Sequence, residues 1–171
     1  MMLDGEAMPS AVVRTAGLVG ALVALAAPLP AGAEMKFRYD CRVTGTSLVD
    51  GLGREGQTAQ LNHFTCRVKG GLLDGFTATG SNILEPRPGG GRLVASIVVA
   101  QKGESSLVYE VREGTRRLRM NNGEVVGWDS TGAGTYKSAT GAAAPLVGKS
   151  FNSIVHSTGP DEFTIDVVVK D

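Results

Sequence analysis

The sequence predicts an all-β protein, an antiparallel barrel of eight or nine strands, with a two-sheet sandwich as the alternative. Glycine accounts for 24 of the 171 residues, without the every-third-residue spacing of collagen. In a chain rich in Val and Thr, this much glycine is typical of short strands joined by tight turns. The best helical candidate after residue 33 is residues 141–147, about one turn, which Pro145 limits. Because a closed sheet leaves no unpaired edge, the barrel is favoured over the sandwich.

The first 33 residues are expected to form a signal peptide. An uncharged apolar run, residues 16–27, follows Arg14 and precedes two prolines and an Ala-Gly-Ala sequence ending at Ala33. The run is too short for a membrane-spanning helix, which needs roughly 20 apolar residues. Acidic residues close to Met1 leave Met8 as an alternative start. Cleavage near Ala33 would leave residues 34–171 as one domain, periplasmic or secreted and not spanning a membrane.

Strand-like stretches follow one another between turn signals along the mature part. The clearest is residues 162–170, in which Phe163 and Ile165 alternate with polar residues, as in a sheet with one wet face. Nine such stretches are expected, at residues 36–44, 58–68, 76–84, 92–100, 106–112, 116–121, 124–136, 150–156 and 162–170.

The strongest turn signal is Asn-Gly at residues 122–123, because a type I′ turn needs positive φ at both central positions. A two-residue turn would pair Arg117 with Trp128 and stack a guanidinium on the indole. A three-residue turn with a bulge would instead pair Leu118 with Val126, which aligns apolar partners better. The sequence leaves both registers open.

Cys41 and Cys66 are expected to form a disulfide bond. They are the only two cysteines, and an oxidising compartment favours a bridge. Apolar residues alternate in residues 37–43 and 64–68, and each cysteine falls on the apolar face of its segment. No C-x-x-C motif is present, and the two histidines have no ligand-like spacing. We therefore expect neither a metal nor a cofactor.

Residues 132–141, Gly-Ala-Gly-Thr-Tyr-Lys-Ser-Ala-Thr-Gly, resemble a motif of the allene oxide cyclase and dirigent barrel superfamily. In that motif a strand ending G-x-G-x-Y/F leads into a G/S-A-x-G turn and then a G-x-x-F strand, supplied here by residues 148–151. The resemblance covers roughly residues 128–155 and implies an eight-stranded antiparallel barrel whose central cavity can hold an apolar molecule. The catalytic residues of the plant enzymes lie outside this stretch, so none is carried over. A disulfide between the first two strands is not part of the family's pattern.

Aromatic residues are candidates for lining such a cavity, because they line ligand sites as well as filling cores. Aromatic residues make up only 5% of the chain, which suggests that few bulky side chains fill the barrel. The candidate lining residues are Trp128, Tyr136, Phe151 and Tyr109. Arg117 and Arg119 share a strand face and are candidates for contact with an anion or a partner. Acidic neighbours could equally make this a solvated charged face.

No catalytic constellation stands out in the sequence. His63 is expected to point outward, and His156 and Ser157 are consecutive strand residues whose side chains face opposite sides. The carboxylates nearest to strand ends are those of Asp74, Glu85 and Asp129. No spacing brings them together for acid–base work.

The sequence favours a binding role over an enzymatic one. The expected function is binding of a small apolar ligand in the barrel interior. The alternatives are an envelope interaction module without a cavity ligand and, third, an isomerase or cyclase of the same fold. The partner would be a small apolar molecule or an envelope protein. A formal net charge of zero argues against nucleic acid, which requires a clustered positive field.

Overall fold

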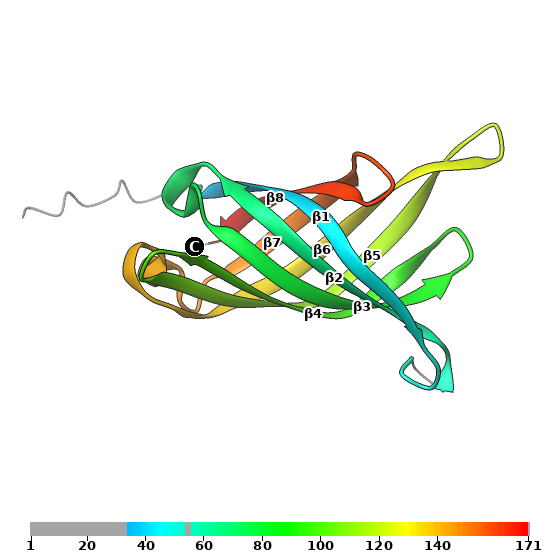
Figure 1. Cartoon of the computed structure of the whole chain (residues 1–171), viewed down its shortest axis with the longest axis horizontal. Helices are drawn as coiled ribbons and strands as arrows, with labels where there is room; N and C mark the ends of the chain where they lie inside the picture. The colour runs from blue at the N-terminus through cyan, green and yellow to red at the C-terminus, as the bar shows by residue number, and fades with distance from the viewer. Residues whose placement is uncertain (1–33, 54–55, 171) are drawn as a thin grey trace, which may run out of the picture. The chain divides into compact units, whose positions relative to one another are not determined.

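A computed structural model describes residues 34–53 and 56–170, which form a closed, eight-stranded antiparallel barrel (Figure 1). Each strand pairs with the next along the chain, and the last pairs with the first to close the sheet. The all-β barrel is confirmed, and the sandwich alternative is wrong. The expected signal peptide lies outside the described residues. The strands are β1 (Lys36–Val49), β2 (Ala59–Lys69), β3 (Thr77–Arg87), β4 (Gly90–Lys102), β5 (Ser105–Asn121), β6 (Glu124–Ala139), β7 (Ser150–Ser157) and β8 (Glu162–Lys170).

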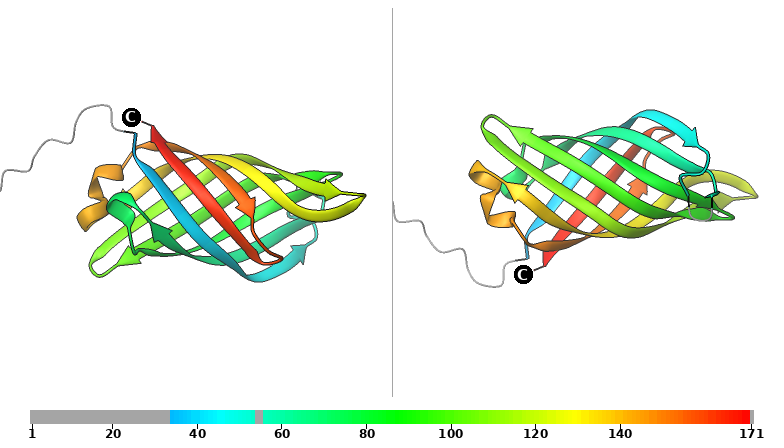
Figure 2. Two further views of the ribbon diagram at one scale, coloured as in Figure 1. Left: turned by 90° about the horizontal axis from the view of Figure 1, so that it is seen from above. Right: turned by 90° about the horizontal axis from the view of Figure 1, so that it is seen from below.

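The two ends of the barrel differ (Figures 1 and 2). At one end lie two short 3₁₀ helices, η2 (Gly71–Leu73) and η3 (Gly141–Leu146), which contact each other. Leu73 and Leu146 of these helices are fully buried, as is Phe76 just after η2, so apolar side chains plug this end. We call it the closed end. The other, which we call the open end, carries the β1–β2, β3–β4, β5–β6 and β7–β8 hairpins.

The strand count is eight because two of the nine predicted stretches form one strand. Residues 106–112 and 116–121 both belong to β5, and the Glu-Gly pair between them lies within the strand, directly after a β-bulge at Arg112, and is not a turn. The register against β6 shifts between Val111 and Glu113. A bulge adds one residue to a strand without ending it, so the side chains beyond it change faces.

The turn at residues 122–123 contains two residues, with φ of 50° at Asn122 and 87° at Gly123. Met120 pairs with Val125, as the two-residue alternative predicts. A further register shift lies next to this pair, between Arg119 and Met120, so that Leu118 pairs with Trp128. The register therefore combines the short turn of one alternative with the bulge of the other.

The core contains a group of four aromatic side chains between the barrel centre and the closed end. Tyr109 packs edge-on against Tyr39, Tyr136 and Phe151, with ring centroids 6.2, 5.7 and 5.3 Å away. All four side chains are almost fully buried. Burial raises the pKa of the Tyr39 and Tyr136 phenols well above the usual range.

Gly134 of β6 allows this aromatic group to pack against the sheet. A Cβ atom there would lie 2.3 Å from the carbonyl oxygen of Glu110 and 2.4 Å from Cζ of Phe151. Neither neighbour can move freely, because one is backbone and the other is a buried ring. The glycine in the G-x-G segment is thus required by the close approach of a neighbouring strand and side chain.

We expect Gly134→Ala to lower the free energy of unfolding by about 3 kcal/mol, as overpacking in a rigid core does. Urea denaturation followed by circular dichroism would measure the loss. Gly45→Ala is the matched control, because a Cβ there would have only an ordinary contact, 3.7 Å from Cδ2 of His63. Equal losses in the two variants would contradict the steric explanation.

Cys41 and Cys66 form the expected disulfide bond and occupy directly opposed positions on β1 and β2. Both are buried in the core. The bridge links residues that are 25 positions apart, so it restricts the unfolded chain.

Replacing both cysteines by alanine should lower the free energy of unfolding by about 3.5 kcal/mol on the chain-entropy account. Urea denaturation with and without a reducing agent measures this. The wild-type protein should become as unstable as the Cys41→Ala/Cys66→Ala variant once reduced, while the variant itself does not respond. A wild-type protein whose stability is unchanged by full reduction would refute the stabilising role.

Candidate functional site

The candidate site is a cavity of about 80 Å³ in the half of the barrel nearer the open end. Its wall is mostly apolar and draws on strands from the whole circumference of the sheet. Apolar lining residues include Leu84, Leu93, Val98, Trp128, Phe151 and Phe163. The cavity exists because inward positions at this level carry small residues, among them Ser96, Gly132 and Ser153.

Three of the four aromatic residues named from the sequence line this cavity, namely Trp128, Tyr109 and Phe151. Tyr109 and Phe151 form its floor above the closed end, where they also belong to the buried aromatic group. Tyr136 does not line the cavity and packs against Phe151 with ring centroids 4.9 Å apart. Trp128 lies toward the open end and contacts Phe163, with ring centroids 5.6 Å apart.

Side-chain amides of β2 and β3 form a polar group in one wall of the cavity. Asn62 is buried, accepts hydrogen bonds at Oδ1 from Thr46 Oγ1 (3.0 Å) and Gln60 Nε2 (2.7 Å), and donates from Nδ2 to Asn82 Oδ1 (2.8 Å). Asn62 and Asn82 line the cavity. A buried amide is stable here because its acceptor and donor are both used.

Arg116 of β5 brings a positive charge into the cavity wall, with β4 between it and the amides of β2 and β3. On β5, Val111 faces inward before the bulge, and the shift at Glu113 turns Arg116 inward after it. Arg116 pairs with Ser130 of β6, which also lines the cavity. Arg117, one residue further on, is exposed.

The guanidinium of Arg116 lies over the indole of Trp128, with Cζ 4.2 Å from the ring centroid. The sequence alternative placed Arg117 against this ring, but the bulge gives the position to Arg116. Nε of Arg116 is buried and has no hydrogen-bond partner. Among the described residues, no carboxylate lies within ion-pair distance of it. Burial lowers the pKa of Arg116, although an arginine remains a cation at physiological pH.

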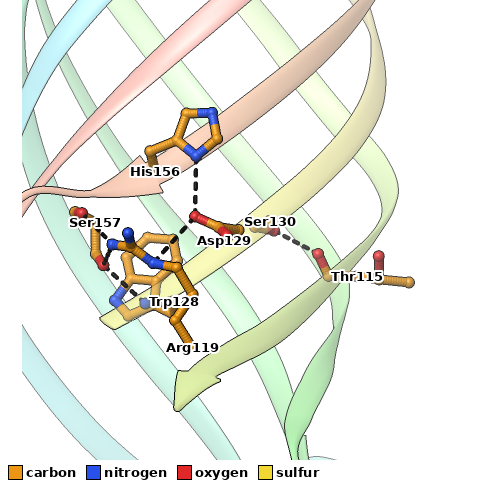
Figure 3. A network of polar contacts seen from close by, with 7 residues as sticks. All are labelled: Thr115, Arg119, Trp128, Asp129, Ser130, His156 and Ser157. Carbon is orange, nitrogen blue, oxygen red and sulfur yellow. Dashed lines mark hydrogen bonds and ion pairs between the residues drawn. The ribbon is translucent and has the colours of Figure 1, made fainter. Parts of the chain in front are cut away.

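A network of polar contacts at the rim of the open end holds the strand that carries Trp128 (Figure 3). Ser157 Oγ accepts hydrogen bonds from the backbone N–H of Trp128 (2.8 Å) and from Nη2 of Arg119 (3.0 Å). Arg119 Nη2 also donates to the backbone carbonyl of Ser157 (2.7 Å). The carboxylate of Asp129 lies 3.4 Å from Nε of Arg119 and 2.9 Å from Nδ1 of His156.

This network holds strands β5, β6 and β7 together at the rim, and we call it the clamp. It does not have the geometry of a serine nucleophile with its base. The Ser157 hydroxyl contacts the N–H groups of Arg119 and Trp128, while His156 contacts Asp129 on the outer face. A serine nucleophile would need the imidazole within hydrogen-bond reach of its oxygen. Arg119, a residue singled out from the sequence for anion contact, thus lies within the rim network, whereas Arg117 is exposed on the outer surface.

The remaining candidates from the sequence are dispersed. Asp74 accepts a hydrogen bond from the backbone N–H of Gly70 (2.9 Å) within the turn at the closed end. Glu85 is buried, with a carboxylate oxygen 3.6 Å from Nη2 of Arg87. His63 is exposed, its Nδ1 2.7 Å from Ser81 Oγ. Within residues 34–53 and 56–170, no three His, Cys, Asp or Glu side chains could hold a metal ion together.

Arg116 is the site residue that the sequence reasoning missed. An alternating pattern places Arg117 and Arg119 on one face and Arg116 on the other, but it does not say which face is inside. The bulge at Arg112 decides that, and the only sequence signal beside it was the Glu-Gly pair at residues 113–114, which reads equally well as a turn.

Comparison with protein-family models, with curated proteins and with solved structures finds no match to this chain. The part of the chain that the structure describes has no helix long and apolar enough to cross a membrane.

We expect Ser157→Ala to lower the free energy of unfolding by about 1–2 kcal/mol, because two N–H donors lose a buried acceptor. The fluorescence of Trp128, the only tryptophan, should shift to longer wavelength as its strand loosens. Ser138→Ala is the control, since Ser138 is an exposed serine of β6, the strand that carries Trp128. An unchanged emission maximum in Ser157→Ala would show that the clamp does not position Trp128.

Proposed function

We propose that this protein binds a small, largely apolar molecule in the cavity of its open half. The observation that carries the proposal is the unfilled apolar space itself. The interior of an eight-stranded barrel is just wide enough to be filled by side chains or to hold one small ligand. Here the closed half is filled and the half next to the open end is not.

The size of the cavity restricts the ligand. Its volume of about 80 Å³ is roughly half that of an engineered cavity of about 150 Å³ that binds benzene. The cavity as it stands accepts a short or narrow group. A longer ligand requires the partly buried Leu93 or Trp128 to move aside.

We also propose that the chain belongs among the allene oxide cyclase and dirigent-like barrels. Support comes from the closed eight-stranded antiparallel meander and from the segment that suggested the resemblance. In that segment, β6 ends after Gly134 and Tyr136, η3 forms the turn, and Phe151 begins the inward face of β7. An inner cavity agrees with a binding role for this chain.

Export is part of the proposal. The disulfide between Cys41 and Cys66 is typical of proteins that fold in an oxidising compartment. The signal peptide expected over residues 1–33 would deliver the barrel to the periplasm or the cell exterior.

A second candidate function, an envelope interaction module, is favoured by apolar side chains at the hairpin tips. Met120, Val125 and Val126 at the tip of the β5–β6 hairpin are all more than half exposed. In Figure 1 this hairpin projects beyond the body of the barrel. Exposed apolar clusters of this kind are typical of contact surfaces for another macromolecule.

We expect the protein purified from its own host to carry an apolar molecule, visible as added mass in native mass spectrometry and lost after denaturation. Ser96→Leu should abolish the added mass, because Ser96 is a buried residue of the cavity wall and leucine would occupy the space. Ser138→Leu, the same change at an exposed position, should retain it.

A wild-type protein that is consistently free of added mass would count against the binding role and favour the interaction module. Retention of the molecule by a folded Ser96→Leu protein would place the binding site elsewhere. Circular dichroism of both variants establishes that the barrel is intact.

A further inference from the structure

We propose that the ligand is an anionic amphiphile, a monocarboxylate with an apolar chain, and that Arg116 binds its carboxylate. This inference rests on the proposed function and adds the chemical class of the ligand. It follows from the surroundings of a single side chain, that of Arg116, in the cavity wall.

Arg116 is a cation in a site with little to neutralise it. Of the side chains that line the cavity in the described part of the chain, it alone is charged. Its Nε is buried without a hydrogen-bond partner. Leaving the N–H donors of a charged group without acceptors is costly, and a negatively charged acceptor removes that cost.

The stacking on Trp128 does not remove the need for an acceptor. The indole contacts the face of the guanidinium, with Cζ 4.2 Å from the ring centroid. The N–H groups point outward in the plane of the guanidinium and are left for hydrogen bonds. Stacking therefore fixes the plane of the guanidinium. Its N–H donors can then bind a planar carboxylate through two parallel hydrogen bonds.

The count of charges selects a monoanion. One cation neutralises one carboxylate, whereas a phosphate monoester would bring a second negative charge into a mostly apolar site. The apolar wall around Phe163 and Val98 would take the chain of the ligand, and Arg116, on the open-end side of the aromatic floor, would take its head. The arrangement of head and chain thus matches an amphiphile.

The test uses a pair of probes that differ only in the head group, octanoate and 1-octanol, whose chains enter the cavity when the partly buried Leu93 moves aside and Trp128 stays in place. Trp128 is the only tryptophan and lies in the cavity wall, so its fluorescence reports binding, and calorimetry gives an independent dissociation constant. We expect the wild-type protein to bind octanoate at least tenfold more tightly than octanol. Hydrogen bonds to charged groups are worth roughly ten- to hundredfold in affinity.

Arg116→Met should weaken octanoate binding by roughly tenfold or more and change octanol binding by less than about twofold. It keeps an unbranched side chain of similar length and removes the charge. Arg116→Lys should recover part of the octanoate affinity, because it restores the charge without the planar fork. Arg117→Met is the matched control, since Arg117 is the neighbouring arginine on the outer surface, and it should leave both affinities unchanged.

Equal wild-type affinity for the two probes, or equal octanoate affinity in the wild-type and Arg116→Met proteins, would overturn the inference while leaving the proposed function intact. Failure of the wild-type protein to bind either probe would overturn the proposed function and this inference with it. The comparison of probes on the wild-type protein needs no variant, so it decides the matter even if Arg116→Met does not fold.

Discussion

The pairing of β1 with β8 is the constraint on which the interior of this protein depends. Seven registered pairs, from Lys36–Val168 to Arg42–Glu162, join the first strand to the last. Where these residues pair, the first and last strands have no free edge, and each strand residue faces either the interior or the outside. Without this seam Phe37 and Val167 would lie at open edges, and the cavity would have one wall missing.

Given closure, the bulges decide which side chains enter the cavity. β5 is the clearest case. Its first half presents Tyr109 and Val111 to the interior, and the register shift before Glu113 places Arg116 inside rather than Arg117. One extra residue therefore decides which of two neighbouring arginines, Arg116 or Arg117, brings its guanidinium into the cavity. Bulges near functional sites commonly redirect a side chain in this way.

Features that depend on residues close together in the sequence could be predicted, and features that depend on the pairing of distant segments could not. Alternation over a few residues is local, so the buried faces around Cys41 and Cys66 were predictable, and with them the disulfide. The position of Arg116 depends on the register between β5 and β6, which the alternation within β5 does not encode. Sequence reasoning also placed Tyr136 in the cavity wall with Tyr109. Tyr136 does face the interior, but it packs against Phe151 and does not line the cavity, because alternation gives the face of a residue and not its depth in the barrel.

The uneven filling of the barrel favours a binding role over a purely structural one. In the closed half, large rings meet at van der Waals distance, and even Gly134 has no spare room. In the open half, the inward positions hold small or polar residues such as Ser96 and Ser153, where leucine would bury more apolar surface. A sequence shaped only for stability would not keep, beside such a space, a cation that has no counter-charge among the described residues. Residues that give up stability in this way are typical of sites where a ligand completes the packing.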